Sequence, residues 1–268
     1  EDLSLGDITT EGLVSPELSG RASFVVKAPG VLAGMEVALR VCHRADPSLQ
    51  GQALVADGSP VAPGTVVGEV WGPVAGILRA ERAALNLLTR MSGIATDTAR
   101  YVEALKGLPC AVLDTRKTAP GLRLLDKYAV RMGGGRNHRF HLGDGVLVKD
   151  NHWEALREAG LTLAQGLERL RGRIHHLIKV QVEAKDMAEV KEAVEAGAEA
   201  LLLDNMSPEE MAAVVREVAG RLPLEASGGI TLETARQAAQ SGVDFISIGA
   251  LTHSPRALDI SLELEYRP

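Results

Sequence analysis

The chain has 268 residues, of which 29 are Lys or Arg and 35 are Asp or Glu, giving a formal charge of −6, and 3% are aromatic. A chain of this length forms one large domain or two ordinary ones, with a core that must be largely aliphatic. The acidic balance argues against a general nucleic-acid or membrane-surface binder. No apolar run is long enough to span a membrane. The two cysteines, Cys42 and Cys110, lack metal spacing and predict a reduced, cytoplasmic protein.

The first third of the chain mixes strand-like and helical patterns. Short β-rich runs at residues 22–26 and 66–70 are separated by Pro and Gly, which is typical of hairpin turns. A long helical pattern then runs from residue 79 to about 105, and Ser92-Gly93 marks a candidate kink or break in it.

The rest of the chain alternates short apolar runs with helical patterns. The runs show little polar alternation, which predicts strands buried on both faces of a parallel sheet. Strand alternating with helix is typical of βαβ units and of an α/β architecture. The predicted strands cover residues 111–113, 145–148, 177–182, 200–203, 222–226 and 245–248, and the predicted helices cover residues 153–171, 187–196, 208–219 and 232–240.

Polar residues or glycines follow every one of these predicted strands. In an α/β barrel the carboxyl ends of the strands meet at one mouth, where the active site lies. Six runs are fewer than the eight strands of a closed barrel, so we predict an incomplete one. The segments that follow the strands are Asp114–Lys117, Lys149–His152, Glu183–Lys185, Asp204-Asn205, Ser227–Gly229 and Gly249-Ala250.

Cations gather on or next to this predicted mouth. Arg can hold a carboxylate or phosphate through two parallel hydrogen bonds, while Lys acts as a compact point charge. Because an unpaired buried charge is costly, we interpret the cluster as a pocket for a strongly anionic ligand. For any single cation, an ion pair with a nearby surface acid stays an alternative. The cluster comprises Arg82, Arg116, Lys117, His138, Arg139 and Lys149.

Two carboxylates follow consecutive predicted strands, Glu183 and Asp204. Sites that bind Mg²⁺ together with a polyphosphate often use one or two carboxylates and leave the other positions to water and substrate oxygens. The spacing alone leaves open that these acids only balance Lys149 or Lys185.

Glycines follow the last two predicted strands, in Ser227-Gly228-Gly229 and at Gly249, with His253 shortly after. Glycine allows backbone N–H groups to approach an anion closely, and phosphate sites recur after the late strands of α/β barrels. These positions indicate a phosphorylated ligand, with simple tight turns as the alternative.

Three motifs make the sequence recognisable: Asp114-Thr115-Arg116-Lys117-Thr118, then Gly133-Gly134-Gly135 with Asn137-His138-Arg139, then Lys149-Asp150-Asn151-His152. In this order, and together with the segment Asp2–Thr10, they resemble the quinolinate phosphoribosyltransferase family over nearly the whole chain. The resemblance implies an α/β protein with an N-terminal α/β open sandwich over residues 1–105, rejoined by 258–268, and an incomplete TIM-like α/β barrel over 106–257.

The resemblance also implies a reaction. Such an enzyme, a nicotinate-nucleotide pyrophosphorylase and pentosyltransferase of de novo NAD biosynthesis, transfers phosphoribosyl from phosphoribosyl pyrophosphate to quinolinate with Mg²⁺. The products are nicotinate mononucleotide, pyrophosphate and CO₂. The family implies a homo-oligomer, a dimer or a hexamer built as a trimer of dimers, in which the neighbouring subunit completes the active site. No nucleic-acid or membrane partner is expected.

Roles for individual residues follow from the resemblance by motif position. Arg82, Arg116, His138 and Arg139 would hold the two quinolinate carboxylates. Lys117 and Lys149 would contact substrate carboxylate or pyrophosphate oxygens. Glu183 and Asp204 would bind ribose hydroxyls or position Mg²⁺. Ser227, Gly228, Gly249 and His253 would hold the 5′-phosphate. Lys27 stands where the family commonly has an Arg that reaches the neighbouring subunit's site, so it keeps the charge but loses the planar fork.

Two other functions stay open at this stage. A paralogue could act on another pyridine acid such as nicotinate, and the double set of cations around Arg116 and His138-Arg139 argues for a dicarboxylate instead. A non-catalytic sensor of a phosphorylated metabolite would not need Glu183 and Asp204 at the mouth.

Overall fold

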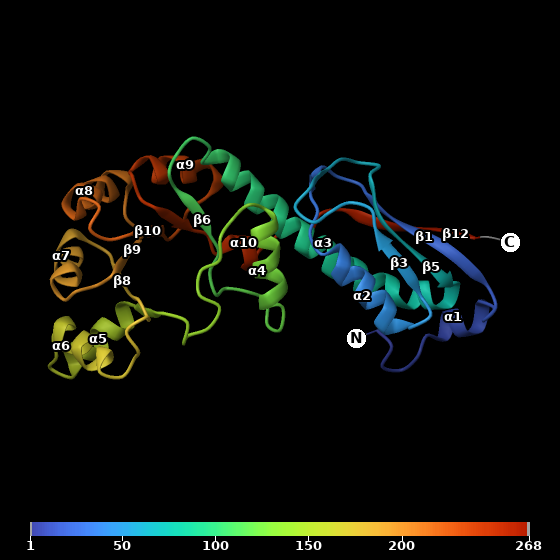
Figure 1. Cartoon of the computed structure of the whole chain (residues 1–268), viewed down its shortest axis with the longest axis horizontal. Coiled ribbons are helices and arrows are strands. Elements are labelled where there is room, and N and C mark those ends of the chain that lie inside the picture. Colours follow the sequence, from blue (N-terminus) through green and yellow to red (C-terminus); the bar gives the residue numbers. More distant parts are fainter. Residues whose placement is uncertain (1, 267–268) are drawn as a thin grey trace. The chain divides into compact units, whose positions relative to one another are not determined.

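The computed structural model describes residues 2–266, and Figure 1 shows the arrangement of their helices and strands. The chain forms two compact units. Among the described residues, the first comprises 2–99, 119–134 and 251–266, and the second comprises 100–118 and 135–250. The predicted domain boundaries, after residues 105 and 257, stay a prediction. No helix in the described part of the chain has the length and apolar character needed to cross a bilayer.

The first unit is built on an antiparallel sheet with the order β12-β1-β5-β3. Helix α2 and the beginning of α3 cover one face of this sheet, and their apolar side chains share one core with β1 and β5. Phe24, Leu32, Ile77 and Leu88 are among the side chains fully buried in this core. The elements of this unit are α1 (Ile8–Leu13), β1 (Ser19–Val26), β2 (Gly30–Val31), α2 (Met35–Ala45), β3 (Gln50–Ala53), β4 (Pro60–Val61), β5 (Val66–Pro73), α3 (Val74–Ala104, which continues into the second unit), α4 (Arg123–Met132), α10 (Ala250–His253) and β12 (Ile260–Tyr266).

The Ser92-Gly93 pair does not break helix α3, contrary to the expectation from sequence. The Ser92 hydroxyl donates to the Ala33 carbonyl and accepts from the Ala33 N–H, and a Cβ at Gly93 would overlap the backbone of Arg256. The small residues are there because other parts of the chain approach the helix closely, and such contacts leave no local signal of their own.

The second unit is built on a parallel sheet with the order β6-β11-β10-β9-β8-β7, and helices pack along it. In the described residues β6 and β7 do not pair with each other, so the sheet stays open. The prediction of an α/β protein with an N-terminal sandwich and an incomplete barrel is confirmed. The elements of this unit are β6 (Ala111–Leu113), β7 (Val146–Val148), α5 (Asp150–Glu158), α6 (Leu163–Arg171), β8 (Val180–Ala184), α7 (Met187–Glu195), β9 (Ala200–Asp204), α8 (Pro208–Val218), β10 (Leu224–Ser227), α9 (Leu232–Gln240) and β11 (Phe245–Ser247).

Two expectations about this unit need correction. The predicted helix at 153–171 is two helices, because Gly160 takes a positive φ of 68° and Thr162 starts α6 with a reciprocal cap to Gln165. The strands are also not uniformly apolar. On β8, Val180 and Val182 are fully buried, whereas Gln181 and Glu183 on the opposite face are only partly buried. That second face is polar, and it forms the site described next.

Candidate active site

A pocket of about 640 Å³ lies at the carboxyl edge of the parallel sheet. All strands of this sheet run in the same direction, so the residues at their carboxyl ends are brought to one edge. Of the predicted site residues, nine line this pocket: Arg116, Lys117, His138, Arg139, Lys149, Glu183, Asp204, Ser227 and Gly228. Segments separated by more than a hundred residues therefore meet at one place.

The alternation of side chains along the strands decides which residues reach the pocket. Successive residues of a strand point to opposite faces, so Gln181 and Glu183 share the pocket face of β8. Glu225 and Ser227 share the pocket face of β10 in the same way. The register pairs Ser227 on β10 with Asp204 on β9, so the turn that begins at Ser227 lies next to the Asp204 carboxylate.

Two guanidinium groups, those of Arg116 and Arg139, lie close enough to repel each other. Burial and the charge of Arg116 both lower the pKa of Arg139 from its ordinary value. The Nε atom of Arg116 is buried without a hydrogen-bond partner among the described residues. Two adjacent cations with an unused donor are unfavourable by themselves, and a bound anion relieves both problems.

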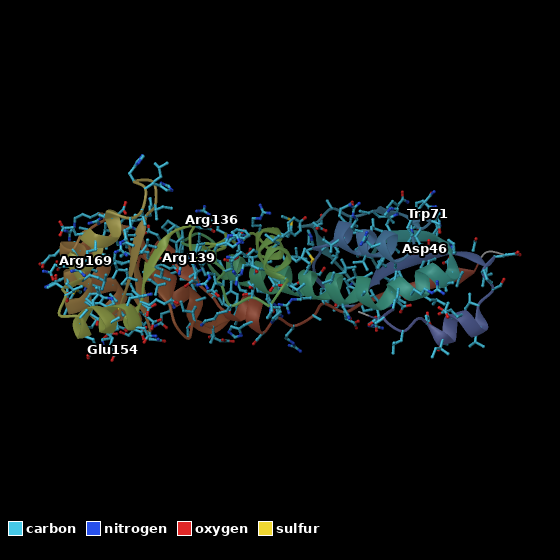
Figure 2. All side chains as sticks on the ribbon, turned by 90° about the horizontal axis from the view of Figure 1, so that it is seen from below. Asp46, Trp71, Arg136, Arg139, Glu154 and Arg169 are labelled. Carbon is cyan, nitrogen blue, oxygen red and sulfur yellow. The ribbon has the colours of Figure 1, made fainter. Side chains whose placement is uncertain are left out.

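The loop that carries His138 and Arg139 is anchored by a buried acid. Asp114 is fully buried and accepts hydrogen bonds from the Asn137 side chain (2.6 Å) and from the His138 N–H (2.8 Å). The backbone of Arg136 pairs with Val112 and with Asp114. Arg136 and Arg139 are both labelled in Figure 2, and only Arg139 lines the pocket, with its guanidinium donating to the Gly145 carbonyl at 2.6 Å.

Glu183 and Asp204 stand beside each other with Lys149. The Lys149 Nζ lies 3.7 Å from Glu183 Oε2. Burial raises the pKa of Glu183, and the charge of Asp204 adds to this rise while Lys149 opposes it. The indole N–H of Trp153 donates to the Glu183 carbonyl at 3.2 Å and so fixes the end of β8.

These acids do not form a complete metal cage. No group of three or more His, Cys, Asp or Glu with the spacing of a metal site occurs in the part of the chain that the structure describes. A pair of carboxylates is nevertheless the donor set that Mg²⁺ uses when substrate oxygens and water supply the other ligands. The residues present therefore fit a magnesium ion that arrives with a polyphosphate.

The turn after β10 is shaped for a close approach to its neighbour. Gly228 has a φ of +91°, and a Cβ there would overlap the Asn205 side chain. Asn205 itself has a φ of +56°, donates its backbone N–H to the Ser227 carbonyl and its side-chain amide to Asp204 at 2.8 Å. Glycine at 228 is thus required by both the backbone conformation and the space available.

The other four predicted site residues do not line this pocket. Lys27, Arg82 and His253 belong to the first unit, and Gly249 follows β11 in the second. Lys27 forms an ion pair with Glu263, which lowers the pKa of that carboxyl. Arg82 is exposed on α3, and the exposed His253 lies 2.6 Å from the Ser254 hydroxyl. Their roles stay predictions.

The structure also shows residues to which the sequence interpretation gave no role. Asn205 and Glu225 line the pocket, and Gln181 lies on the same face of β8 as Glu183. A usable signal was present. Gln181 and Glu225 interrupt short apolar runs, and each lies two residues before a strand-end polar residue, which places it on the same face.

Comparisons with known proteins show the family of the chain. The sequence model for the C-terminal domain of quinolinate phosphoribosyl transferase matches residues 94–263, and the model for its N-terminal domain matches residues 7–92. The chain is 42% identical to a probable nicotinate-nucleotide pyrophosphorylase [carboxylating] of Synechocystis sp., with 98% of this chain and 89% of the relative covered. It is 39% identical to the Bacillus subtilis protein of the same name, with 98% and 90% covered.

A solved structure gives the same result for the fold. The crystal structure of NadC from Streptococcus pyogenes superposes with a TM-score of 0.93 at 39% identity, over 100% of this chain and 93% of that one. A structure of human nicotinic acid phosphoribosyltransferase, at 14% identity and a TM-score of 0.65, shares the fold only. Both domains and their order are thus accounted for over nearly the full length, and the chain belongs to the quinolinate phosphoribosyl transferase family.

Proposed function

We propose that the protein transfers the phosphoribosyl group of phosphoribosyl pyrophosphate to quinolinate and decarboxylates the product to nicotinate mononucleotide. The observation that carries this proposal is the meeting of two guanidinium groups with a pair of acids and a glycine turn in one pocket. The guanidinium groups suit a pyridine dicarboxylate. The acids and the glycine turn suit a sugar polyphosphate that carries magnesium. The relatives named above carry the same activity in their names.

Quinolinate would be held at the cation side of the pocket. Arg116 and Arg139 would bind its carboxylates, because a guanidinium can pair with a carboxylate through two hydrogen bonds. Lys117 and Lys149 would face the pyrophosphate oxygens. The Ser227-Gly228 turn would hold the 5′-phosphate. The phosphate-binding roles of Gly249 and His253 stay predictions from the sequence.

Glu183 and Asp204 would hold Mg²⁺ or the ribose hydroxyls. When bound, the ion would offset the negative charge that develops on departing pyrophosphate. The charge of Lys149 beside Glu183 would act in the same direction.

The chemistry requires positioning and electrostatics more than a nucleophilic side chain. The ring nitrogen forms a bond to ribose C1 as the C1–O bond to pyrophosphate breaks, and the bonding electrons leave with pyrophosphate. The C2–carboxylate bond then breaks, CO₂ departs, and the electron pair on C2 is stabilised by the adjacent positive nitrogen until it takes up a proton. The cations would align both substrates and stabilise the leaving charge.

The decisive experiment is release of labelled CO₂ from quinolinate carrying the label in its 2-carboxylate. We expect release that depends on both phosphoribosyl pyrophosphate and Mg²⁺. Turnover of nicotinate in place of quinolinate would overturn the assignment, and binding of phosphoribosyl pyrophosphate without turnover of either acid would indicate a sensor.

The oligomeric part of the proposal rests on Lys27. In a dimer or a trimer of dimers, this exposed cation would leave Glu263 and enter the partner's pocket. Mixing a Lys27→Ala chain with a Lys149→Ala chain tests this, because mixed dimers would regain one intact site. Light scattering gives the oligomer number, and the absence of any regain of activity would contradict the shared site. We also propose that the enzyme acts in the cytoplasm.

A further inference from the structure

The ring of His138 is held at both of its nitrogen atoms. Its Nδ1 accepts the backbone N–H of Arg139 at 2.8 Å, so the ring proton belongs on Nε2. Nε2 lies 3.2 Å from the Oε1 atom of Gln181. In this arrangement the imidazole is neutral and donates to Gln181.

The Gln181 amide is itself oriented by a buried acid. Its Nε2 donates to Glu225 Oε2 at 2.8 Å, and an amide nitrogen can only donate. The amide oxygen must therefore face His138. Glu225 Oε2 also lies 3.6 Å from His138 Nε2, so the three side chains form one small network on the pocket face of β8 and β10.

Burial of Glu225 in this position lowers the stability of the fold. Its side chain is 5% exposed, and its Oε1 atom has no hydrogen-bond partner among the described residues. A buried carboxylate with so few hydrogen bonds destabilises a fold, and an apolar residue like its neighbours Leu224 and Ala226 would serve the core better. Its presence calls for a role in the pocket.

We propose that Gln181 and Glu225 are positioning residues that hold His138 in the neutral tautomer with the proton on Nε2. Arg116 and Arg139 then supply the positive charge that contacts the substrate carboxylates. The His138 ring lies beside them, neutral and fixed in orientation. This limits the number of full charges on the carboxylate that must leave. The identity of the substrate rests on the proposed function, whereas the tautomer does not.

Spectroscopy tests the tautomer without any substrate. In protein labelled with ¹⁵N at its seven histidines, the His138 signal, assigned with a His138→Gln variant, should show a protonated Nε2 and an unprotonated, downfield Nδ1 at neutral pH. A doubly protonated ring, or a proton on Nδ1, would overturn the proposal. Failure of the proposed function would instead appear as absent quinolinate turnover with this signal intact.

Paired variants separate the hydrogen bond from the charge. Gln181→Met and Glu225→Met remove the network, and each should raise KM for quinolinate by about tenfold while KM for phosphoribosyl pyrophosphate stays unchanged. Glu225→Gln keeps an acceptor for Gln181 and should retain both the wild-type KM and the wild-type tautomer. Glu217→Gln, which removes an exposed acid on α8, is the matched control for the lost charge.

Three outcomes would count against the proposal. Methionine variants with wild-type KM and tautomer would remove any role for the network. A Glu225→Gln variant as impaired as Glu225→Met would show that charge, not positioning, is what matters. An equal rise of KM for both substrates would indicate general damage. If Glu225→Met does not fold, Gln181→Met and Glu225→Gln decide the question.

Discussion

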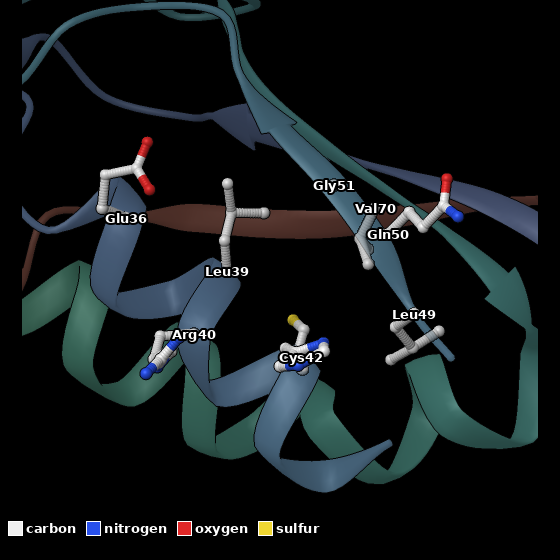
Figure 3. Close-up of a pocket in the computed structure, with 9 residues that line it drawn as sticks. Glu36, Leu39, Arg40, Cys42, Leu49, Gln50, Gly51 and Val70 are labelled. Atoms are coloured by element: carbon white, nitrogen blue, oxygen red, sulfur yellow. The ribbon is translucent and has the colours of Figure 1, made fainter. Parts of the chain in front are cut away.

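The antiparallel and the parallel sheet of this protein each border a pocket, and the two pockets differ in what they can do. The groove beside the antiparallel sheet has a volume of about 260 Å³ and lies between helix α2 and the edge strand β3. Figure 3 shows its labelled side chains coming from α2 on one side and from Leu49–Gly51 with Val70 on the other. Apolar groups line it together with single charges such as Glu36 and Arg40.

The difference comes from strand direction. In the antiparallel sheet neighbouring strands point in opposite directions, so the polar residues at their ends go to opposite edges. In the parallel sheet all carboxyl ends meet at one edge, and cations, acids and glycines from distant segments gather there. In this protein the charged residues gather where the topology brings strand ends together, and mutations can test this.

The largest effect is expected for Lys149→Ala, compared with Lys185→Ala. Both lysines follow parallel strands, but only Lys149 lines the pocket. Lys149 is proposed to face the leaving pyrophosphate, so loss of its charge should lower kcat by roughly 100- to 1000-fold. Lys149 is half exposed, so the melting temperature should change by no more than a few degrees. Steady-state kinetics and calorimetry measure both, and full activity or simple unfolding of Lys149→Ala would contradict its role.

The next largest effect is expected for Arg116→Ala, with Arg40→Ala as the control from the other pocket. Arg116 is one of the two residues proposed to bind the quinolinate carboxylates, so its removal should raise KM for quinolinate by about 10- to 100-fold. Arg40→Ala should leave KM unchanged. Equal effects of the two substitutions would remove the contrast between the pockets.

Gly228→Ala tests the phosphate side. The positive φ and the overlap with Asn205 should distort the turn and raise KM for phosphoribosyl pyrophosphate by about tenfold. Gly229→Ala is the matched variant, because Gly229 also has a positive φ of 59° but a Cβ there meets nothing within 4 Å, so the pair isolates the effect of the overlap with Asn205. If Gly229→Ala proves the more harmful of the two, the close approach at Gly228 is not what shapes the site.

The smallest effect concerns stability and pH. The pKa of Glu183 is raised above its ordinary value of 4.5, so the folded protein holds that proton more tightly than the unfolded chain. Below pH 4.5 the acid is protonated in both states and contributes nothing. As the pH rises through the folded pKa, ionisation destabilises the fold. Without substrates, Glu183→Gln should therefore raise the melting temperature slightly at pH 7 and not at pH 4. A lower melting temperature at pH 7 would show that the ion pair with Lys149 outweighs burial.

Much of the fold and most of the site could be predicted from the sequence for local reasons. Short apolar runs separated by helical periodicity define parallel strands, and the residue after each run lies at the mouth whatever the details of packing. That is why the sequence predicts Arg116, Lys149, Glu183 and Asp204 in one pocket, where the structure has them. The family resemblance could be recognised from the motifs around Asp114, Asn137 and Lys149 because each of them is contiguous in sequence.

Tertiary structure decided what depends on partners far apart in the chain. Ser92-Gly93 looked like a helix break because its reason, the close approach of Ala33 and Arg256, lies outside its own segment. The sequence interpretation took Gln181 and Glu225 for parts of apolar strands. Only the pairing of β8, β9 and β10 brings them together, where Gln181 also contacts His138. The sequence by itself determined which chemistry reaches the mouth, because strand ends are local. The hydrogen bonds that orient it were decided by the sheet, because they join residues more than forty positions apart.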